Sequence, residues 1–153
     1  MNFSQKRSAT LITALATGLV CSALAYAHGD TAGHKVIAPN DLTWNDIPAQ
    51  PGAKRAVLFG DPTKPGPYTY RVKFPPNSKN PPHTHPDNRQ VTIISGTWYF
   101  GHGDKLDTEK ATKLPAGTFL TEPANSVHYT FTTSEEVTIQ ISGTGPTGST
   151  PHK

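Results

Sequence analysis

The sequence predicts an all-β fold, either a sandwich or a barrel of short strands, from two observations. First, about seven or eight short segments are apolar or alternate apolar with polar residues, as strands do. Second, 15 prolines and 13 glycines separate these segments, and none of the 153 residues belongs to a long helical period. A chain of short strands punctuated in this way closes its sheets into a sandwich or barrel.

The first 27 residues have the features of a secretory signal peptide. Lys6 and Arg7 form a basic start, an apolar run covers residues 11–25, and Ala25-Tyr26-Ala27 matches the small-x-small cleavage pattern. The run is short for a membrane span and no stop-transfer pattern follows it. We therefore expect residues 1–27 to be removed and the chain to be exported, to the periplasm or beyond, without a stable membrane anchor. An uncleaved N-terminal anchor is the alternative.

Loss of this segment changes what the charge and the cysteine content imply. The full chain has 14 basic and 11 acidic residues, and removal of Lys6 and Arg7 leaves 12 against 11, a net charge of +1. Because no basic cluster remains either, we expect no nucleic-acid binding. The only cysteine, Cys21, lies in the expected signal, so the mature chain has no disulfide and no thiolate ligand or nucleophile.

The segment that follows the signal predicts an N-terminal arm. Residues 28–50 are polar and broken by prolines, so we expect them to pack on the domain through a few apolar side chains. These side chains are Val36, Ile37, Leu42, Trp44 and Ile47.

Residues 51–147 carry the strand signals and form the predicted barrel domain. The apolar run Ala56–Phe59 is closed by Gly60-Asp61-Pro62, and in PYTYRVKF the residues Tyr68, Tyr70, Val72 and Phe74 share one face. QVTIISG and TWYFG follow, then a polar turn at GHGDK and a segment, LDTEKATKL, with room for one helical turn. GTFLTEP, SVHYTFTT and EEVTIQISG complete the set of strands, and residues 148–153 are expected to be a loose tail.

The segment PPHTHPDNRQVTIISG, residues 81–96, has the strongest chemical signal. His83 and His85 lie two residues apart, so on an extended chain their side chains point the same way. The flanking prolines favour extended geometry, since proline restricts its own φ and disfavours a helical residue before it. Two imidazoles form half of a transition-metal site, and His128, after a turn at PAN, is the candidate third ligand. Two surface histidines in a proline-rich loop are the alternative.

These segments resemble the two sequence motifs of a small cupin. The first motif runs His-x-His, three or four residues, Glu, six residues, Gly, and the second runs Gly, five residues, Pro-x-Gly, two residues, His, three residues, Asn. The matching residues are His83, His85 and Gly96, then Gly117, Pro123 and His128, while Asn125 and Thr132 replace the second Gly and the final Asn of the later motif. The resemblance covers about residues 50–147. It implies a single cupin jelly-roll β-barrel, a double-stranded β-helix, with an N-terminal arm.

The resemblance also implies a metal centre. In metal-binding cupins the His-x-His pair, the Glu and the later His hold one metal inside the barrel. By position His83, His85 and His128 inherit this role, and the metal would be a divalent Fe, Mn, Cu, Ni or Zn ion. The chain departs from the pattern at one ligand, since Arg89 stands where the Glu is expected.

Arg89 raises a physical problem, because a guanidinium cannot coordinate a cation. On a strand it shares its side with Val91 and Ile93, the expected buried residues, and a buried cation needs a paired anion. Glu122 is the best candidate: it replaces the missing carboxylate ligand, or pairs with Arg89, or does both with one oxygen for each. A bidentate fork suits such a pair. Gln90 offers a weak amide ligand, but strand parity points its side chain to the face opposite that of Arg89.

These features predict an exported cupin that binds or acts on a small oxygen-bearing molecule, which can be anionic. As an enzyme it would use the metal as a Lewis acid in oxygenase- or isomerase-type chemistry. Arg89 and Glu122 would then be the catalytic residues that tune the charge or steer the substrate. A sensing or carrier module without turnover and a barrel that has lost its metal are the alternatives, and a homodimer is left open.

Overall fold

The computed structural model of the chain describes residues 33–153, so the expected signal peptide at 1–27 lies outside the described residues. Apart from one short 3₁₀ helix, Pro39–Asp41, the elements of this part of the chain are strands. The strands pair antiparallel in two sheets, which confirms the predicted all-β class. No helix within residues 33–153 is long and apolar enough to cross a membrane.

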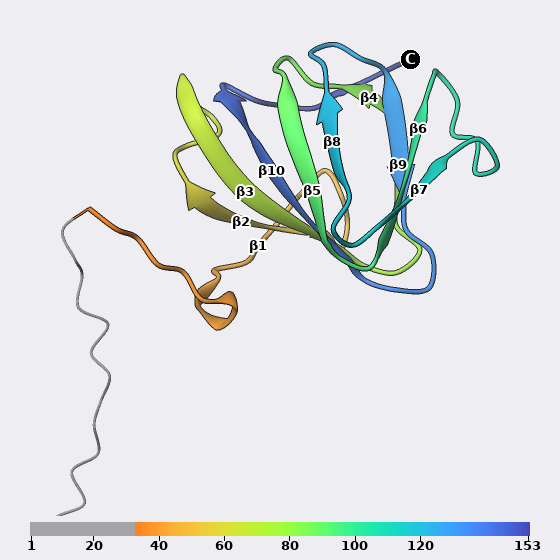
Figure 1. The fold of residues 1–153 in the computed structure, drawn as a ribbon. Helices are drawn as coiled ribbons and strands as arrows, with labels where there is room; N and C mark the ends of the chain where they lie inside the picture. Colours follow the sequence, from red (N-terminus) through yellow and green to blue (C-terminus); the bar gives the residue numbers. More distant parts are fainter. Residues whose placement is uncertain (1–32) are drawn as a thin grey trace, which may run out of the picture. The chain divides into compact units, whose positions relative to one another are not determined.

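The two sheets have six and five strands. The first has the spatial order β1 (Asn45–Asp46), β2 (Lys54–Phe59), β3 (Gly66–Phe74), β10 (Val137–Gly145), β5 (Arg89–Ser95) and β8 (Phe119–Glu122). The second has the order β11 (Thr150–Pro151), β4 (Lys79–Thr84), β9 (His128–Phe131), β6 (Thr97–His102) and β7 (Thr112–Pro115). Figure 1 shows the long strands β3, β10 and β5 side by side, with β4, β9 and β6 in the other layer. This is the jelly-roll arrangement that the sequence predicts.

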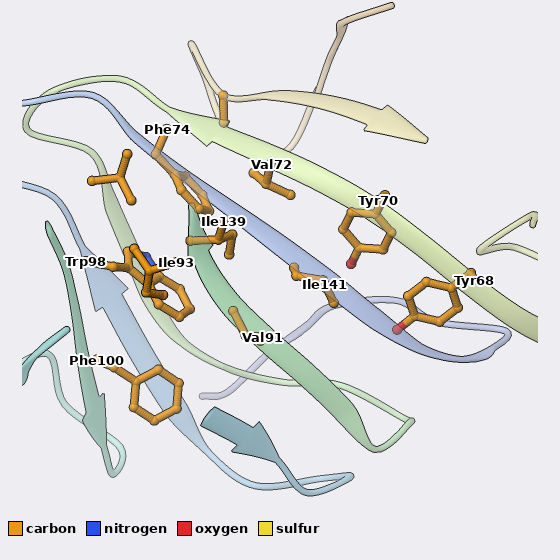
Figure 2. Close-up of a cluster of buried hydrophobic side chains, with 12 residues drawn as sticks. Tyr68, Tyr70, Val72, Phe74, Val91, Ile93, Trp98, Phe100, Ile139 and Ile141 are labelled. Atoms are coloured by element: carbon orange, nitrogen blue, oxygen red, sulfur yellow. The ribbon is translucent and has the colours of Figure 1, made fainter. Parts of the chain in front are cut away.

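The hydrophobic core fills the space between the sheets. In β3 every second residue is buried, as the alternation in PYTYRVKF predicts, and the same holds at the start of β5. Figure 2 shows these side chains on the same face of the sheet as Ile139 and Ile141 of β10, with Trp98 and Phe100 of β6 across from them. The core residues are Tyr68, Tyr70, Val72 and Phe74 of β3, Val91 and Ile93 of β5, Trp98 and Phe100 of β6, and Val137, Ile139 and Ile141 of β10.

The N-terminal arm packs on the domain through some of the expected side chains. Ile47 packs against the core, and the Lys73 ammonium lies 4.8 Å from the centre of the Trp44 ring. Val36 is 77 % exposed, so its expected packing is wrong. Asn45–Asp46 pairs with β2, which makes part of the arm an edge strand of the six-stranded sheet.

The structure corrects two further expectations. In the segment LDTEKATKL a turn covers only residues 108–110. The last residues of the segment belong to β7, which pairs with β6. The C-terminal tail is not loose throughout: Thr150–Pro151 pairs with β4, and the His152 N–H donates to the Pro82 carbonyl. β4 is paired with β9 on its other side, so its remaining backbone groups would face solvent without this added strand.

Gly96, the motif glycine between β5 and β6, has a φ of +74°, and a Cβ there would lie 2.5 Å from the Glu136 carbonyl oxygen. We predict that Gly96→Ala lowers the free energy of unfolding by roughly 3 kcal/mol or more, because strain and a backbone clash add. Gly103, with φ +116° and open space around its Cα, is the matched control, and Gly103→Ala should cost about 1–2 kcal/mol. Equal losses for the two variants in urea unfolding would contradict the role of the clash.

Candidate metal centre

Three histidines from two neighbouring strands meet inside the barrel. His83 on β4 and His128 on β9 are direct cross-strand partners, and His85 follows β4 on the same side as His83. Each of the three offers one ligand atom, and these atoms lie within 4.8 Å of one another. The side chains are 4 %, 2 % and 7 % exposed for His83, His128 and His85. The structure therefore brings together the three residues selected from the sequence and excludes the alternative of surface histidines.

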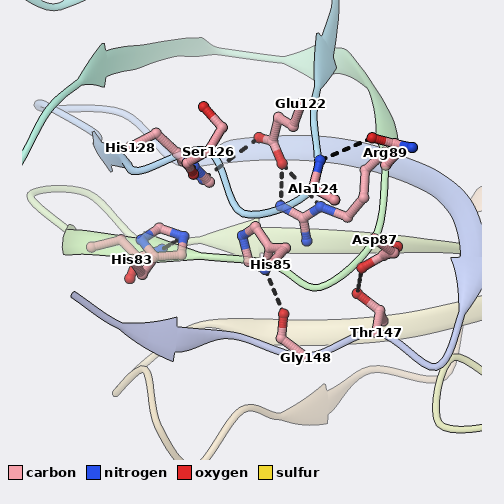
Figure 3. A network of polar contacts seen from close by, with 12 residues as sticks. His83, His85, Asp87, Arg89, Glu122, Ala124, Ser126, His128, Thr147 and Gly148 are labelled. Atoms are coloured by element: carbon pink, nitrogen blue, oxygen red, sulfur yellow. Dashed lines mark hydrogen bonds and ion pairs between the residues drawn. The ribbon is translucent and has the colours of Figure 1, made fainter.

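Backbone carbonyls determine which ring nitrogen of each histidine carries the proton. His83 Nδ1 lies 2.8 Å from the Pro81 oxygen, and His128 Nδ1 lies 3.0 Å from the Ser126 oxygen. His85 Nδ1 lies 2.5 Å from the Gly148 oxygen, as Figure 3 shows. A carbonyl oxygen only accepts, so each ring donates from Nδ1 and a neutral ring then has its acceptor lone pair on Nε2. Metal-binding histidines are commonly oriented by such a bond.

Burial keeps the three rings neutral at pH 7. It lowers the pKa of His83 to about 4, with the neighbouring His128 adding to the effect. Burial also lowers the pKa of His128 to about 4, and it lowers the pKa of His85 to about 2 with Arg89 contributing. Since imidazole binds a metal in its neutral form, these rings need not lose a proton first.

Arg89 is buried and is paired with Glu122, as the sequence analysis anticipates for one of its alternatives. The two residues are directly opposite in the register of β5 and β8, and they are 5 % and 2 % exposed. Arg89 Nε donates to Glu122 Oε2 at 2.9 Å, and Nη2 donates to the same oxygen. Burial opposes the charged form of Arg89, but the Glu122 carboxylate together with Tyr70 and Tyr68 outweighs this and raises the Arg89 pKa. Gln90 is exposed, which confirms the predicted strand parity.

The second oxygen of Glu122 is left for the histidines. Because both guanidinium donors converge on Oε2, the pair is not the expected two-oxygen fork. Oε1 is buried, has no hydrogen-bond partner, and lies 3.9 Å from His128 Nε2. Figure 3 shows the carboxylate of Glu122 between Arg89 and His128. One carboxylate thus contacts the guanidinium and faces the histidine cluster at the same time.

A second buried acceptor faces the same space. His85 Nε2 has no hydrogen-bond partner among residues 33–153, and His83 Nε2 is 3.1 Å from the Asn80 amide nitrogen. Unpartnered buried acceptors are rare and call for a water, an ion or a proton beside them. A set of neutral imidazole nitrogens and one carboxylate oxygen suits divalent transition metals, so the residues present fit such an ion.

Sequence reasoning missed the residues that hold His85. Asp87 is 9 % exposed and accepts hydrogen bonds from Tyr68 and Thr147. Thr147 precedes Gly148, whose carbonyl orients the His85 ring. Strand parity places Asp87 on the buried side with Arg89, which was the available signal. Its partner Thr147 is 60 residues away in the sequence, so nothing local identified it.

The polar cluster lines one part of a cavity of about 490 Å³. The cavity also reaches apolar core side chains, including Val72, Phe74, Trp98 and Ile141, and the C-terminal segment contributes Gly148. A volume of this size, in which a polar cluster lies beside an apolar wall, is typical of a small-molecule site.

The buried ion pair generates a stability prediction. Arg89→Met leaves the Glu122 carboxylate unpaired, so we expect a loss of about 3–5 kcal/mol in the free energy of unfolding at pH 7. The double variant Arg89→Met/Glu122→Met removes both charges and should recover most of that loss. Lys64→Met, which removes one partner of the exposed Lys64–Asp61 pair, should cost under about 1 kcal/mol. A double variant less stable than the single one, by urea unfolding, would contradict this account.

The lowered histidine pKa values generate a pH prediction for the metal-free protein. Between pH 6.5, the ordinary value, and about pH 4, the unfolded chain binds more protons than the folded one at His83 and His128. The contribution of these two rings to the free energy of unfolding is therefore fully present above pH 6.5 and is lost as the pH falls toward 4. We expect a loss on the order of 1 kcal/mol per buried ring between pH 7.5 and pH 5, measured by urea unfolding.

His128→Phe should reduce this pH-dependent loss, because Phe cannot titrate, whereas His34→Phe, at an exposed position of the N-terminal arm, should leave it unchanged. A wild-type protein equally stable at both pH values would show that the rings are not buried in the neutral form.

Several solved structures share the fold at low sequence identity. The polyketide cyclase RemF from Streptomyces resistomycificus is 14 % identical with a TM-score of 0.67, covering 78 % of this chain and 86 % of that one. An RmlC-like cupin from Shewanella frigidimarina is 14 % identical with a TM-score of 0.58, covering 73 % and 92 %. The DMSP lyase DddQ from Ruegeria pomeroyi is 17 % identical with a TM-score of 0.55, covering 69 % and 57 %. These likenesses confirm the cupin jelly roll.

The sequence is similar to one curated protein over part of its length and to one protein family over most of its length. A putative germin-like protein 9-2 from Oryza sativa subsp. japonica is 30 % identical over 73 residues, which span 47 % of this chain and about a third, 34 %, of that protein. The family described as the ChrR cupin-like domain matches residues 32–147, which is most of the chain and includes both histidine-bearing segments. On that match, and with the double-stranded β-helix that the structure displays, the chain belongs to the ChrR cupin-like family.

Proposed function

We propose that the barrel binds one divalent transition metal through His83, His85 and His128, with Glu122 Oε1 as a fourth ligand. The observation that carries this proposal is the pair of buried acceptors without a partner, His85 Nε2 and Glu122 Oε1. Leaving such a group unsatisfied costs about 1–3 kcal/mol, and more for a charged one. A cation between them would offset that cost.

Arg89 has a positioning role in this proposal. By holding Oε2 it directs Oε1 to the histidines, and its third contact, from Nη1 to the Tyr70 hydroxyl at 3.4 Å, keeps the guanidinium at the cavity wall. The position that holds the Glu in the first cupin motif thus carries the residue that orients a carboxylate from β8. In this proposal the carboxylate ligand comes from β8, where the cupin motif would supply it from the position of Arg89 on β5.

The charges of these residues favour a small oxygen-bearing ligand. The three rings are neutral and Arg89 balances Glu122, so the positive charge of a bound metal is not cancelled by these side chains. When bound, the metal would supply Lewis acidity toward a ligand oxygen. Apolar core side chains line much of the cavity, and a surrounding of low polarity strengthens electrostatic attraction to an anion.

We infer an exported, metal-dependent cupin that acts on a small oxygen-bearing molecule. The N-terminal residues 1–27 support export through their basic start, apolar run and cleavage pattern. Iron, manganese, copper, nickel and zinc all suit the donor set. Turnover of a bound ligand separates the enzyme from a binding or sensing module that uses the same cavity.

Elemental analysis tests the metal proposal. We expect about one Fe, Mn, Cu, Ni or Zn per chain after purification without chelator, and a rise in Tm when metal is restored to stripped protein. The double variant His83→Ala/His128→Ala should lose the metal, and Glu122→Gln should weaken its binding by about 10–100-fold. His102→Ala, on the exposed end of β6, should retain it. Absence of both a bound metal and a Tm response would refute the proposal.

A further inference from the structure

The cavity contains a cation that the metal proposal does not use. Arg55 lies on β2 and is the register partner of Val72 on β3, and cross-strand partners share a face of the sheet. Val72 faces the interior, and Arg55 lines the same cavity while remaining exposed. Arg55 therefore stands where the cavity opens to solvent.

Arg55 differs from Arg89 in having no anionic partner. Within residues 33–153 the ion pairs involve other cations, and no acidic side chain lies within 4.0 Å of the Arg55 guanidinium. Its guanidinium instead contacts an aromatic ring, with the guanidinium carbon 5.8 Å from the centre of the Tyr70 ring. The guanidinium thus rests near an aromatic ring with its hydrogen-bond donors available.

A count of the charges lining the cavity identifies the class of ligand. The charged lining residues are Arg55, Arg89 and Glu122. Arg89 and Glu122 pair with each other, so of these three charges only that of Arg55 is uncompensated. A guanidinium presents two parallel N–H donors that match the two oxygens of a carboxylate.

Tyr70 connects the two ends of the site. Its ring lies beside Arg55 and its hydroxyl accepts from Arg89, which is paired with the carboxylate facing the histidines. Val72 and Ile141 continue the apolar wall alongside it. A ligand with an acid group at Arg55 and an apolar body along this wall would therefore extend toward the histidine cluster.

We propose that Arg55 binds the carboxylate of a small organic acid whose apolar body lies along Tyr70, Val72 and Ile141. This proposal deepens the proposed function by naming the substrate class. It rests on the proposed metal site only where the far end of the ligand meets the histidines. Arg55 selects the acid by charge and geometry, and the wall selects an apolar or planar body by burial.

Calorimetric titration with two probes tests this subsite. The probes are 3-phenylpropanoate and its uncharged counterpart 3-phenylpropanamide, titrated into protein stripped of metal on a chelating resin, with no free chelator present. We expect the wild type to bind the acid about 10-fold or more tightly than the amide. Arg55→Gln should lower the affinity for the acid about 10-fold and leave the affinity for the amide unchanged, which also shows that the cavity remains folded.

Arg71→Gln is the matched control. Arg71 lies on β3 next to Val72, on the opposite face of the sheet, where its Nε donates to Gln140, and it does not line the cavity. This variant makes the same change in net charge and should keep the preference for the acid. Equal loss in both variants would assign the preference to long-range charge and overturn the proposal.

Two other results would also overturn it: an Arg55→Gln variant that keeps the preference for the acid, or a wild type that binds neither probe at millimolar concentration. Because the titration uses metal-free protein, its outcome does not depend on the metal site. Arg55→Gln should in turn bind metal as the wild type does, so failure of the subsite and failure of the metal proposal give different patterns.

Discussion

The pairing of Arg89 with Glu122 is the constraint on which the polar interior of the barrel depends. A guanidinium and a carboxylate that are 5 % and 2 % exposed are stable there only together, because either charge alone is strongly disfavoured in a dry interior. The register of β5 and β8 provides the pair by placing the two residues directly opposite. Since both donors of Arg89 take one carboxylate oxygen, the other oxygen is left facing the histidines. The arginine thus changes which strand supplies the carboxylate and keeps the carboxylate inside.

The histidine cluster depends on backbone carbonyls in the same way. His83 and His128 each use the carbonyl two residues earlier, so their local strands suffice to orient them. His85 instead depends on Gly148, which is held by the hydrogen bond of Thr147 to Asp87 and by the pairing of β11 with β4. The C-terminal segment is therefore part of the site, because it sets the orientation of one of the three rings.

Particular residues show how far sequence reasoning reached. Alternation placed Tyr68, Val72 and Val91 in the core and placed Arg89 beside them on the buried side, because the strand period of two is a local property. The His-x-His spacing and the later histidine indicated the cluster. The roles of Asp87 and Arg55 were missed, since Asp87 is recognised only through Thr147 and Arg55 only through the cavity it shares with Tyr70. The loose tail was wrong for the same reason, as nothing near residue 150 reveals an open edge on β4.

The sequence by itself determined most of the strands, the buried face of β3 and of the start of β5, the family resemblance and the need for an anion near Arg89. These follow from local spacing and from the cost of burying an unpaired charge. Only the tertiary structure decided where the Glu122 oxygens point, which carbonyl orients His85, and that a second arginine lines the cavity without an anionic partner among residues 33–153. Those facts depend on strand order and register across the sheets, which join residues far apart along the chain and leave no signal in any one segment.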